Sequence, residues 1–350
     1  MKVTLIVGTR PQIIKSQPVV KELLSKKIAF QIIHTGQHYD YKMSQAFFEE
    51  LDIKDPDLNL GIKEGSPTKQ LSQVIQRLEK PLVNFSPDFV LVPGDTRSAL
   101  GAGLSASRLG FKLVHIEAGA RSNDITLEEE VNRRIIDQSS TILFAPTKHC
   151  LENLHNEKIL GKSYFTGDSM YDVFLEFCRK LNLKKNRRNL ILMTIHRKAN
   201  IENQSRIKKI IHLANQISNI GYEVIFPLHP HTEKQLKSFQ ISMKKINTIK
   251  PVNYSKILSL LSESKMLITD SGGLQKEAYW MNTPCITIRK STEWVETLKA
   301  NQNVLLDTIT PSNLKLVKKI LARKIPTKKI SEFGNGQSSK KMVSILRNNL

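Results

Sequence analysis

Short apolar runs alternate with longer amphipathic stretches along the whole chain. In the first half, runs rich in β-branched and aromatic residues predict strands at residues 4–7, 30–34, 89–92, 112–116, 142–145 and 164–166. Between them, the spacing of apolar positions predicts helices at residues 12–24, 43–51, 68–85, 98–109, 129–140 and 148–156. This alternation is typical of a parallel sheet that is covered by helices on both faces.

The alternation starts again after a polar, basic stretch at residues 180–189. Strands are predicted there at residues 190–194, 223–227, 248–251, 266–269, 285–288 and 304–306. We therefore expect an α/β protein with two Rossmann-like domains that face each other across a cleft. The predicted parts are a first domain at 1–168, a linker region at 169–188, a second domain at 189–335 and a C-terminal helix at 336–350 that crosses back to the first domain.

Composition narrows the class of protein. The chain has 350 residues, of which 40% are hydrophobic, enough for two cores, so a disordered or disulfide-stapled chain is excluded. Its cysteines, Cys150, Cys178 and Cys285, are odd in number and show no paired spacing, which indicates a reducing compartment. No signal peptide is visible, and no stretch approaches the ~20 apolar residues of a membrane span. We expect a cytoplasmic protein without membrane insertion.

The chain is strongly basic, with 53 Lys and Arg against 32 Asp and Glu and a net charge of +21. Its basic runs contain no interleaved aromatic residues, and only 6% of all residues are aromatic, so there is little on which bases could stack. We interpret the charge as a solvated surface and expect no nucleic-acid partner. A basic nucleic-acid-binding protein remains the alternative from another class, and a salt-dependent gel shift would support it.

Ligands of parallel sheets bind beyond the carboxyl ends of the strands, so the residues that follow each strand are the candidates for chemistry. After the first strand, Gly8 opens a turn that leads into a helix with Arg10 and Lys15 on its first turns. A helix N-terminus with two cations favours an anion. The alternative is a tight turn with two exposed cations.

Three carboxylates are predicted near this edge of the first sheet. Asp95 follows the third predicted strand, Glu117 follows the fourth, and Glu129 stands at the start of the next helix. Converging carboxylates of this kind suit proton transfer. A structural ion-pair cluster is the alternative, and its cations would be Arg121, Arg133 and Arg134.

The strand ends of the second half carry a different set of side chains, namely His196, His229, Ser271, Gly272, Gly273 and Glu277. Paired glycines between a strand and a helix present free N–H groups to phosphate. A carboxylate on the first turns of that helix, Glu277, is placed to take both hydroxyls of a ribose.

Metals and redox cofactors are not expected. The His229–His231 pair is too small a ligand set for zinc. The G-x-G-x-x-A sequence at residues 101–106 lies inside a predicted helix, and the chain contains no G-x-x-x-x-G-K-[ST] loop. We predict no metal and no cofactor.

Taken together and in order, these segments resemble the non-hydrolysing UDP-N-acetylglucosamine 2-epimerase family, which has the GT-B fold. The likeness covers almost the whole chain. Its motifs are GTRPQIIK at 8–15, HTGQHYD at 34–40, PGDTRSALGAG at 93–103, HIEAGARS at 115–122, EEEVNRRIIDQ at 128–138, FAPT at 144–147, TGDSMYD at 166–172, TIHRKAN at 194–200, PLHPHT at 227–232, TDSGGLQKEA at 269–278 and GNGQSS at 334–339.

The resemblance implies an isomerase that converts UDP-N-acetylglucosamine to UDP-N-acetylmannosamine for glycan precursor synthesis. UDP is eliminated to leave a glycal and is then added back, with no cofactor, in an enzyme that is usually a homodimer. It implies that Asp95, Glu117, Glu129, Arg133 and His196 are catalytic. It implies a substrate-binding set of Arg10, Lys15, His229, Ser271, Gly272, Gly273 and Glu277.

One departure from the family pattern leaves the substrate open. Bacterial UDP-N-acetylglucosamine enzymes have Thr-Glu-Arg-Pro-Glu after the next strand, whereas this chain has Thr-Glu-Trp-Val-Glu at 292–296. The latter form resembles a subgroup that includes epimerases of UDP-2,3-diacetamido-2,3-dideoxy-glucuronate. A 2-epimerase of such a related UDP-sugar is therefore an alternative function. A GT-B glycosyltransferase is a further alternative, because that fold also uses a glycine turn and a glutamate of its second domain to bind a nucleotide sugar.

Overall fold

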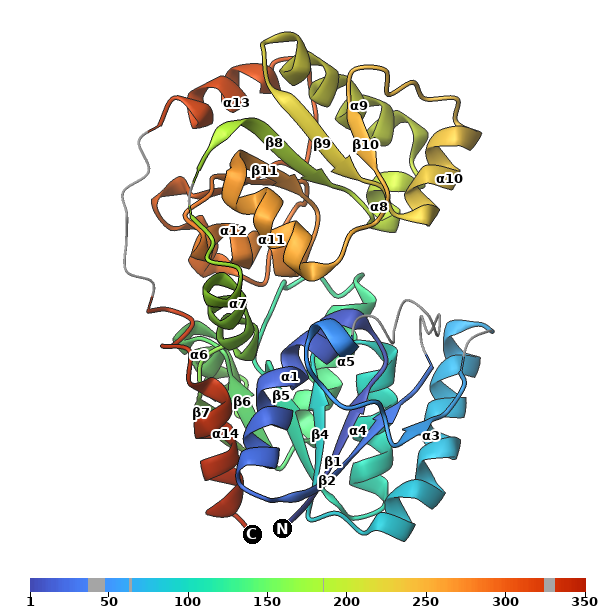
Figure 1. The fold of residues 1–350 in the computed structure, drawn as a ribbon. Coiled ribbons are helices and arrows are strands. Elements are labelled where there is room, and N and C mark those ends of the chain that lie inside the picture. The colour runs from blue at the N-terminus through green and yellow to red at the C-terminus, as the bar shows by residue number, and fades with distance from the viewer. Residues whose placement is uncertain (37–47, 63–64, 185, 324–330) are drawn as a thin grey trace. The chain divides into compact units, whose positions relative to one another are not determined.

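The computed structural model describes residues 1–36, 48–62, 65–184, 186–323 and 331–350 (Figure 1). The chain forms two compact units, unit 1 of Met1–Glu176 with Ile330–Leu350 and unit 2 of Phe177–Lys329. The division falls within helix α7 (Ser169–Lys180), in the segment expected to be a linker. The helix expected at residues 43–51 lies largely outside the described residues.

Unit 1 is built on a seven-stranded sheet in the order β3-β2-β1-β4-β5-β6-β7, in which every paired strand runs parallel to its neighbour. The strands are β1 (Lys2–Val7), β2 (Ala29–His34), β3 (Leu58–Asn59), β4 (Phe89–Pro93), β5 (Lys112–Ile116), β6 (Ile142–Ala145) and β7 (Lys162–Phe165). The strand order reverses between β1 and β4, which makes this the topological switch point of the sheet.

The helices of unit 1 begin at residues that cap them. Ser66, Thr96 and Thr147 each accept a hydrogen bond from the backbone N–H three residues further on. The helices are α1 (Arg10–Ser25), α3 (Pro67–Phe85), α4 (Arg97–Arg108), α5 (Glu128–Ser139) and α6 (Lys148–Asn156), together with most of α7. The sequence thus specifies where several of these helices start as well as which face they bury.

The centre of this sheet is covered by apolar side chains. Every residue of β4 is buried, and so are the last five residues of β1. On one face, β4 packs against α3 and α4 through a cluster that includes Val74, Leu78, Val90, Val92 and Ala102. A strand that is buried on both faces cannot alternate polar and apolar residues, which explains the unbroken apolar runs of the sequence.

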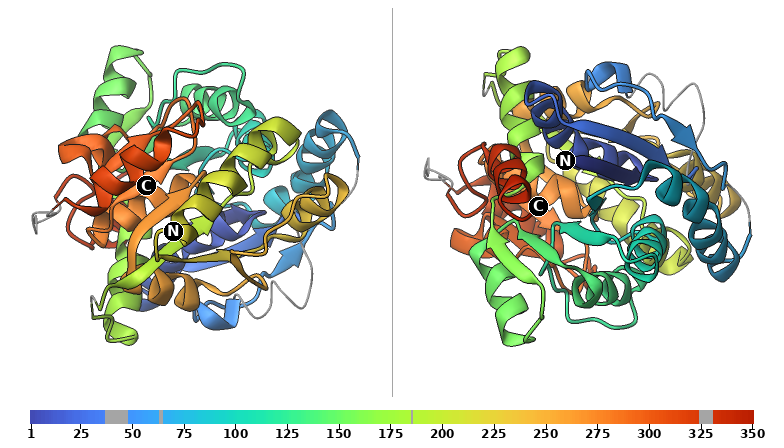
Figure 2. Two further views of the ribbon diagram at one scale, coloured as in Figure 1. Left: turned by 90° about the horizontal axis from the view of Figure 1, so that it is seen from above. Right: turned by 90° about the horizontal axis from the view of Figure 1, so that it is seen from below.

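The C-terminal helix α14 (Ser338–Arg347) belongs to unit 1 and packs against α1 (Figure 2). Asp172 in α7 holds its first turn. The Asp172 carboxylate accepts from the backbone N–H groups of Ser338 at 3.1 Å and Ser339 at 3.0 Å, and from the Ser339 hydroxyl at 3.1 Å. Burial raises the pKa of the Asp172 carboxyl, although these donors act in the opposite direction.

Unit 2 repeats the architecture with six parallel strands in the order β10-β9-β8-β11-β12-β13. They are β8 (Arg188–Thr194), β9 (Glu223–Pro227), β10 (Asn247–Ile249), β11 (Ser264–Thr269), β12 (Cys285–Thr287) and β13 (Asn303–Leu305). The order reverses between β8 and β11.

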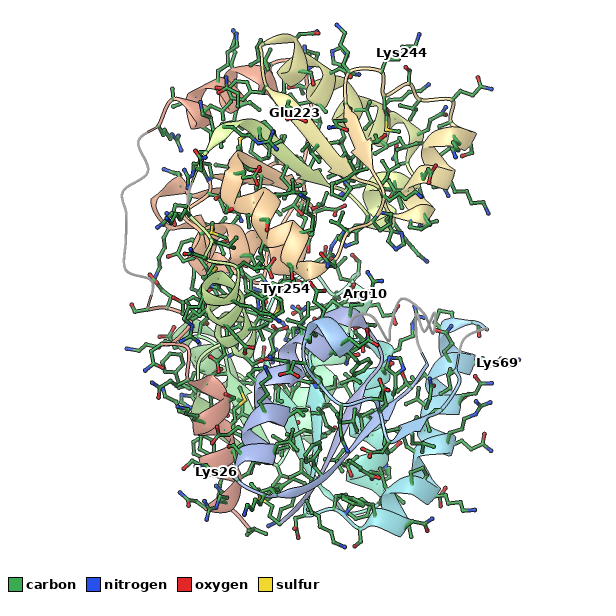
Figure 3. All side chains as sticks on the ribbon, in the orientation of Figure 1. Arg10, Lys26, Lys69, Glu223, Lys244 and Tyr254 are labelled. Atoms are coloured by element: carbon green, nitrogen blue, oxygen red, sulfur yellow. The ribbon has the colours of Figure 1, made fainter. Side chains whose placement is uncertain are left out.

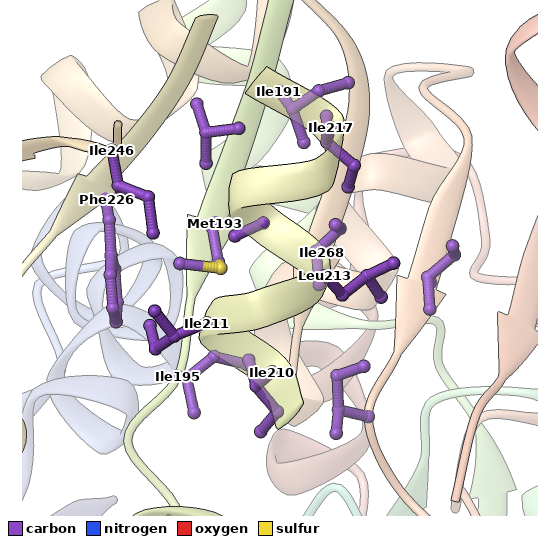
Figure 4. Close-up of a cluster of buried hydrophobic side chains, with 14 of the residues drawn as sticks. Ile191, Met193, Ile195, Ile210, Ile211, Leu213, Ile217, Phe226, Ile246 and Ile268 are labelled. Carbon is purple, nitrogen blue, oxygen red and sulfur yellow. The ribbon is translucent and has the colours of Figure 1, made fainter. Parts of the chain in front are cut away.

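The helices of unit 2 are α8 (Lys198–Ile201), α9 (Gln204–Asn219), α10 (Pro230–Ser238), α11 (Tyr254–Glu263), α12 (Gly272–Trp280) and α13 (Asn313–Leu321), with a 3₁₀ helix η1 at Val295–Asn301. Figure 4 shows part of a core cluster of this unit, in which α9 packs on the sheet through Ile210, Ile211 and Ile217. Leu236 of α10 and Val317 of α13 join the same cluster. Helices α9, α10 and α13 therefore cover one face of the sheet.

The expected α/β class with two Rossmann-like parallel sheets is confirmed. The twelve predicted strands all coincide with observed ones, but strand β3 was missed because it is only two residues long and exposed. No helix in the described part of the chain has the length and apolarity that crossing a membrane requires.

Replacing Asp172 with Ala tests the attachment of α14. The change leaves the N–H groups of Ser338 and Ser339 without their acceptor, so we expect the free energy of unfolding to fall by about 1–3 kcal/mol. Urea unfolding followed by circular dichroism measures this. The matched control is Asp55→Ala at an exposed position, for which we expect a change within about 0.5 kcal/mol. Equal effects of the two variants would contradict this account of the helix.

Candidate active site

The turn after β1 is fixed by a side chain of helix α1. Gln12 accepts from the backbone N–H of Gly8 at 2.9 Å and donates to the carbonyl of Pro93 at 2.8 Å. A Cβ atom on Gly8 would lie 2.2 Å from the Ser98 hydroxyl oxygen, so this position accepts only glycine. The start of α1 is therefore tied to the end of β4, and Arg10 is exposed on its first turn (Figure 3).

Lys15 and Glu117 form a close ion pair at the same edge of the sheet. Their Nζ and Oε1 atoms are 2.5 Å apart, and the side chains are only 10% and 9% exposed. Glu117 has a φ of 76°, which is rare and strained for a residue other than glycine and is often found at functional positions. Gly94 lies beside the pair, because a Cβ there would be 3.0 Å from the Lys15 Nζ.

Asp95 and Arg133 form a second ion pair next to Gly94. The Asn132 amide donates to the backbone carbonyl of Asp95 at 2.9 Å, and Arg133 also reaches Glu130 at 3.3 Å. Helix α5 therefore holds Asp95 through two consecutive residues. The structure brings together four of the predicted residues of unit 1, Lys15, Asp95, Glu117 and Arg133.

Glu129, the third predicted carboxylate, lies half-buried on the first turn of α5. Its neighbour Glu128 pairs with Arg97. The hydrogen bonds that Arg97 donates to the Glu128 carboxylate, helped by the charges of Glu128 and Glu129, raise the pKa of the Arg97 guanidinium. The first turn of α5 is thus an acidic segment beside the Asp95–Arg133 pair.

A buried polar network that the sequence analysis missed lies behind these pairs. The His115 ring bridges Asp137 at 2.6 Å and the carbonyl of Gly94 at 2.9 Å. Asp137 also accepts from the Gly119 N–H and pairs with Arg121 at 2.7 Å. Burial alone would raise the pKa of the Asp137 carboxyl, but His115 and Arg121 hold it below its ordinary value.

Glu130 is a further missed residue. Its carboxylate is fully buried and accepts from both the N–H and the hydroxyl of Ser122, at 2.8 and 2.9 Å. Arg133 and Arg134 pair with the same group. An ion-pair cluster, the structural alternative, therefore exists around these arginines. Arg121 pairs with Asp137 and Glu157, and Arg134 pairs with Glu130 and Glu157. Among the three predicted carboxylates, Asp95 pairs with an arginine of this cluster, Arg133.

In unit 2, Asp270 at the end of β11 organises the turn after β8. Its buried carboxylate accepts from the backbone N–H groups of His196 and Arg197, at 3.1 and 2.9 Å, and from the Asn200 amide at 2.9 Å. The His196 Nδ1 atom lies 3.1 Å from Asp270, while the His196 side chain remains 48% exposed. Asp270 thus fixes His196 and leaves part of its ring open to a ligand.

The glycine turn follows directly. Ser271 caps α12 by accepting from the Leu274 N–H at 3.3 Å, and Gly272 and Gly273 are partly exposed at the helix start. A Cβ on Gly272 would lie 2.8 Å from Glu293 Oε1. Glu293 pairs with Arg289 at 2.8 Å, so a neutralised carboxylate lies against the turn.

The remaining predicted residues of unit 2 lie on α12 and at the start of α10. Glu277 is buried, with 2% of its surface exposed, and His229 is exposed at the cap of α10, where its ring accepts from the His231 N–H at 3.3 Å. Trp294, which marks the departure from the bacterial motif, is buried, and the Lys276 ammonium lies 3.9 Å from its ring centroid. This cation–π contact places Trp294 next to α12.

The carboxyl-terminal edges of the two sheets carry side chains of different chemistry. Unit 1 offers carboxylates paired with cations, which suit proton transfer to and from carbon. Unit 2 offers a helix N-terminus with N–H groups and a histidine, which suit an anion. Within the described ranges, no group of three or more His, Cys, Asp and Glu residues is arranged to hold a metal ion.

Comparison with known proteins identifies the family. A family model described as UDP-N-acetylglucosamine 2-epimerase matches residues 21–347. The chain belongs to this epimerase family. Within it, a UDP-N-acetylglucosamine 2-epimerase of Methanococcus maripaludis is 40% identical, covering 99% of this chain and 98% of that protein. A UDP-2,3-diacetamido-2,3-dideoxy-D-glucuronate 2-epimerase of Pseudomonas aeruginosa is 36% identical and covers 99% of each chain.

Solved structures agree with the family and the fold. The crystal structure of the Methanocaldococcus jannaschii UDP-GlcNAc 2-epimerase in complex with UDP-GlcNAc and UDP matches this epimerase with a TM-score of 0.93 and 37% identity, over 99% of this chain and all of that one. The Neisseria meningitidis enzyme bound to UDP-GlcNAc matches with a TM-score of 0.90 and 29% identity, over 100% of each chain. The expected GT-B fold and the isomerase class are confirmed.

Replacing Asp270 with Asn tests its role in this epimerase. Asn keeps the shape but turns an NH₂ group toward backbone donors, so we expect the free energy of unfolding to fall by about 2–3 kcal/mol. Thermal or urea unfolding measures the loss. Asp307→Asn, at an exposed residue paired with Arg206, is the matched control and is expected to change stability by less than about 1 kcal/mol. Wild-type stability of Asp270→Asn would refute the role of this carboxylate.

Proposed function

We propose that this protein interconverts UDP-N-acetylglucosamine and UDP-N-acetylmannosamine by inversion at C2, and that it supplies a precursor for glycan synthesis. Family membership and the 40% identical relative of that name support this substrate. The observation that carries the proposal is the pair of acidic side chains after β4 and β5, Asp95 and Glu117, each held by a cation.

The chemistry explains why two acidic side chains are useful. The C2 proton of an N-acetyl sugar is not acidic, so direct deprotonation does not invert this centre. In the proposed route a base removes the C2 proton while the C1–O bond breaks, and UDP leaves with the electron pair to give a glycal. UDP then adds back at C1, and an acid delivers a proton to the opposite face of C2. No electrons are transferred to or from a cofactor, and no atoms are lost.

The proposed roles follow from the chemistry of the two edges. Asp95, Glu117 and Glu129 exchange protons at C2, and Arg133 positions Asp95. Lys15 balances the charge of Glu117 and, with Arg10 and His196, attracts the diphosphate. The turn at Ser271, Gly272 and Gly273 donates N–H groups to phosphate oxygens, Glu277 holds the ribose, and His229 assists in binding the nucleotide.

Replacing Asp95 with Asn or Glu117 with Gln tests the carboxylates. Each variant loses its proton-transfer group, so we expect epimerisation to fall by at least about 10³-fold, while UDP still binds with similar affinity. Chromatographic separation of the two epimers and titration calorimetry with UDP measure the two properties.

The matched control is Glu152→Gln, an exposed carboxylate on α6, which should retain full activity. Glu117→Gln leaves the buried Lys15 ammonium without its carboxylate partner. The free energy of unfolding of this variant is therefore measured together with its epimerase activity. Full activity of a well-folded Asp95→Asn or Glu117→Gln variant would refute the assignment.

A second substrate is favoured by one observation. The Pseudomonas aeruginosa relative acts, by its name, on a diacetamido uronate, and it is 36% identical over the full chain. Trp294, which packs beside α12, is part of the Thr-Glu-Trp-Val-Glu form at 292–296, and the resemblance of this form to that subgroup supports the alternative. Assaying UDP-N-acetylglucosamine and the diacetamido uronate side by side decides between them, because the true substrate is expected to have the higher kcat/KM.

A glycosyltransferase is the remaining alternative among enzymes. One such protein, the glycotransferase of kitacinnamycin, matches with a TM-score of 0.58 but only 11% identity, which supports the shared fold alone. Incubation with UDP-N-acetylglucosamine and no acceptor separates the two, because an epimerase reaches equilibrium without one.

We also propose that the enzyme is a cytoplasmic homodimer. Val131 and Ile135 on α5 are 42% and 38% exposed and lie four residues apart on one helix face, which suits contact with a second copy. Light scattering of the purified protein tests this, and a monomer at micromolar concentration would contradict it.

A further inference from the structure

The positive charge of the chain is concentrated in unit 2. Residues 177–329 contain 29 Lys and Arg against 9 Asp and Glu, a net charge of +20. The rest of the chain contains 24 against 23, a net charge of +1. A general richness in lysine would make both units basic, so it does not explain this asymmetry. A substrate with one diphosphate does not require an excess of this size either.

Many of these charges lie on one side of unit 2. Helices α9, α10 and α13 pack on the same face of the sheet, and α9 contacts α13. Their exposed lysines, which we call the lysine face, are Lys208, Lys209, Lys234, Lys237, Lys315, Lys318 and Lys319. Few acids balance them. Glu233 pairs with Lys237, and Asp307 pairs with Arg206, an arginine outside this set.

A hollow lies within this face. A cavity of about 350 Å³ lies between α9 and the segment before α13, lined by Lys208, Lys209 and His212 together with Leu213, Ile309 and Pro311. Cations beside apolar groups suit a ligand that has an anionic head and an apolar continuation, as a phospholipid has at the membrane surface.

The residue types favour a lipid surface over a nucleic acid. The exposed Lys and Arg side chains of α9, α10 and α13 are all lysines, because the arginine of α9, Arg206, is half-buried and pairs with Asp307. Lysines act as point charges, whereas recognition of base edges favours the planar fork of arginine. No aromatic residue is among the large hydrophobic side chains exposed in the described part of the chain, so there is no platform for stacking bases. These exposed apolar residues also do not lie on α9, α10 or α13, which indicates attachment without insertion.

We propose that the lysine face docks this enzyme reversibly on membranes that carry anionic lipids. The attraction is electrostatic, because each lysine near such a surface contributes on the order of 1 kcal/mol within about one Debye length. Docking is independent of the reaction, since the lysine face contains none of the residues assigned to the substrate.

Sedimentation with vesicles tests the proposal. The full-length protein is mixed with vesicles of phosphatidylcholine alone or with about one third phosphatidylglycerol, at about 0.1 M and about 0.5 M salt. We expect binding only to the anionic vesicles and only at the lower salt. Replacing three lysines of α13 together, as K315E, K318E and K319E, is expected to weaken binding by at least about 100-fold.

The matched control is K26E, K80E and K148E, which removes the same charge from exposed lysines of unit 1. It should keep vesicle binding, and both triple variants should keep epimerase activity, which shows that they fold. Equal loss of vesicle binding in both triple variants would assign the effect to net charge and overturn the proposal. Tighter binding to duplex DNA than to vesicles, or no binding to anionic vesicles at about 0.1 M salt, would also overturn it.

Discussion

The structure depends on the way parallel strands end. All strands of a parallel sheet finish at one edge, and at a switch point two neighbouring strands diverge into helices on opposite faces. In unit 1 this occurs between β1 and β4, and in unit 2 between β8 and β11. Short polar segments that follow these strands are thereby brought together although they are 70 or more residues apart, as the contact of Asp270 with His196 shows.

At the ends of these strands, several carboxylates each form an ion pair with a cationic side chain. Glu117 pairs with Lys15, Asp95 with Arg133, and Glu293 with Arg289. A buried carboxylate without such a partner would be costly, so each pair allows an acid to remain in a partly dry site. The arrangement suits a reaction in which a proton is moved at carbon while a diphosphate leaves and returns. Behind the pairs, His115 and Asp137 anchor the backbone that carries them.

The sequence predicts the elements of this fold well because the strands are buried on both faces and read as unbroken apolar runs. The candidate residues of unit 1 were predictable for the same reason, since Asp95 and Glu117 directly follow such runs. Asp270 occupies the same kind of position and was overlooked beside the more visible glycines. Glu130 and Asp137 could not be assigned, because their partners Ser122, His115 and Arg121 are defined only by folding. The catalytic and binding roles of all the candidate site residues stay predictions.

The central claim is that acidic side chains of unit 1 exchange the C2 proton while UDP is detached. Proton NMR of the purified protein with UDP-N-acetylglucosamine in heavy water tests it most directly. The account predicts that the C2 epimer forms without acceptor or cofactor and carries deuterium at C2, because the acid that protonates the glycal has exchanged with the solvent. An epimer that keeps its original C2 hydrogen, or sugar that is released without any epimer, would contradict it.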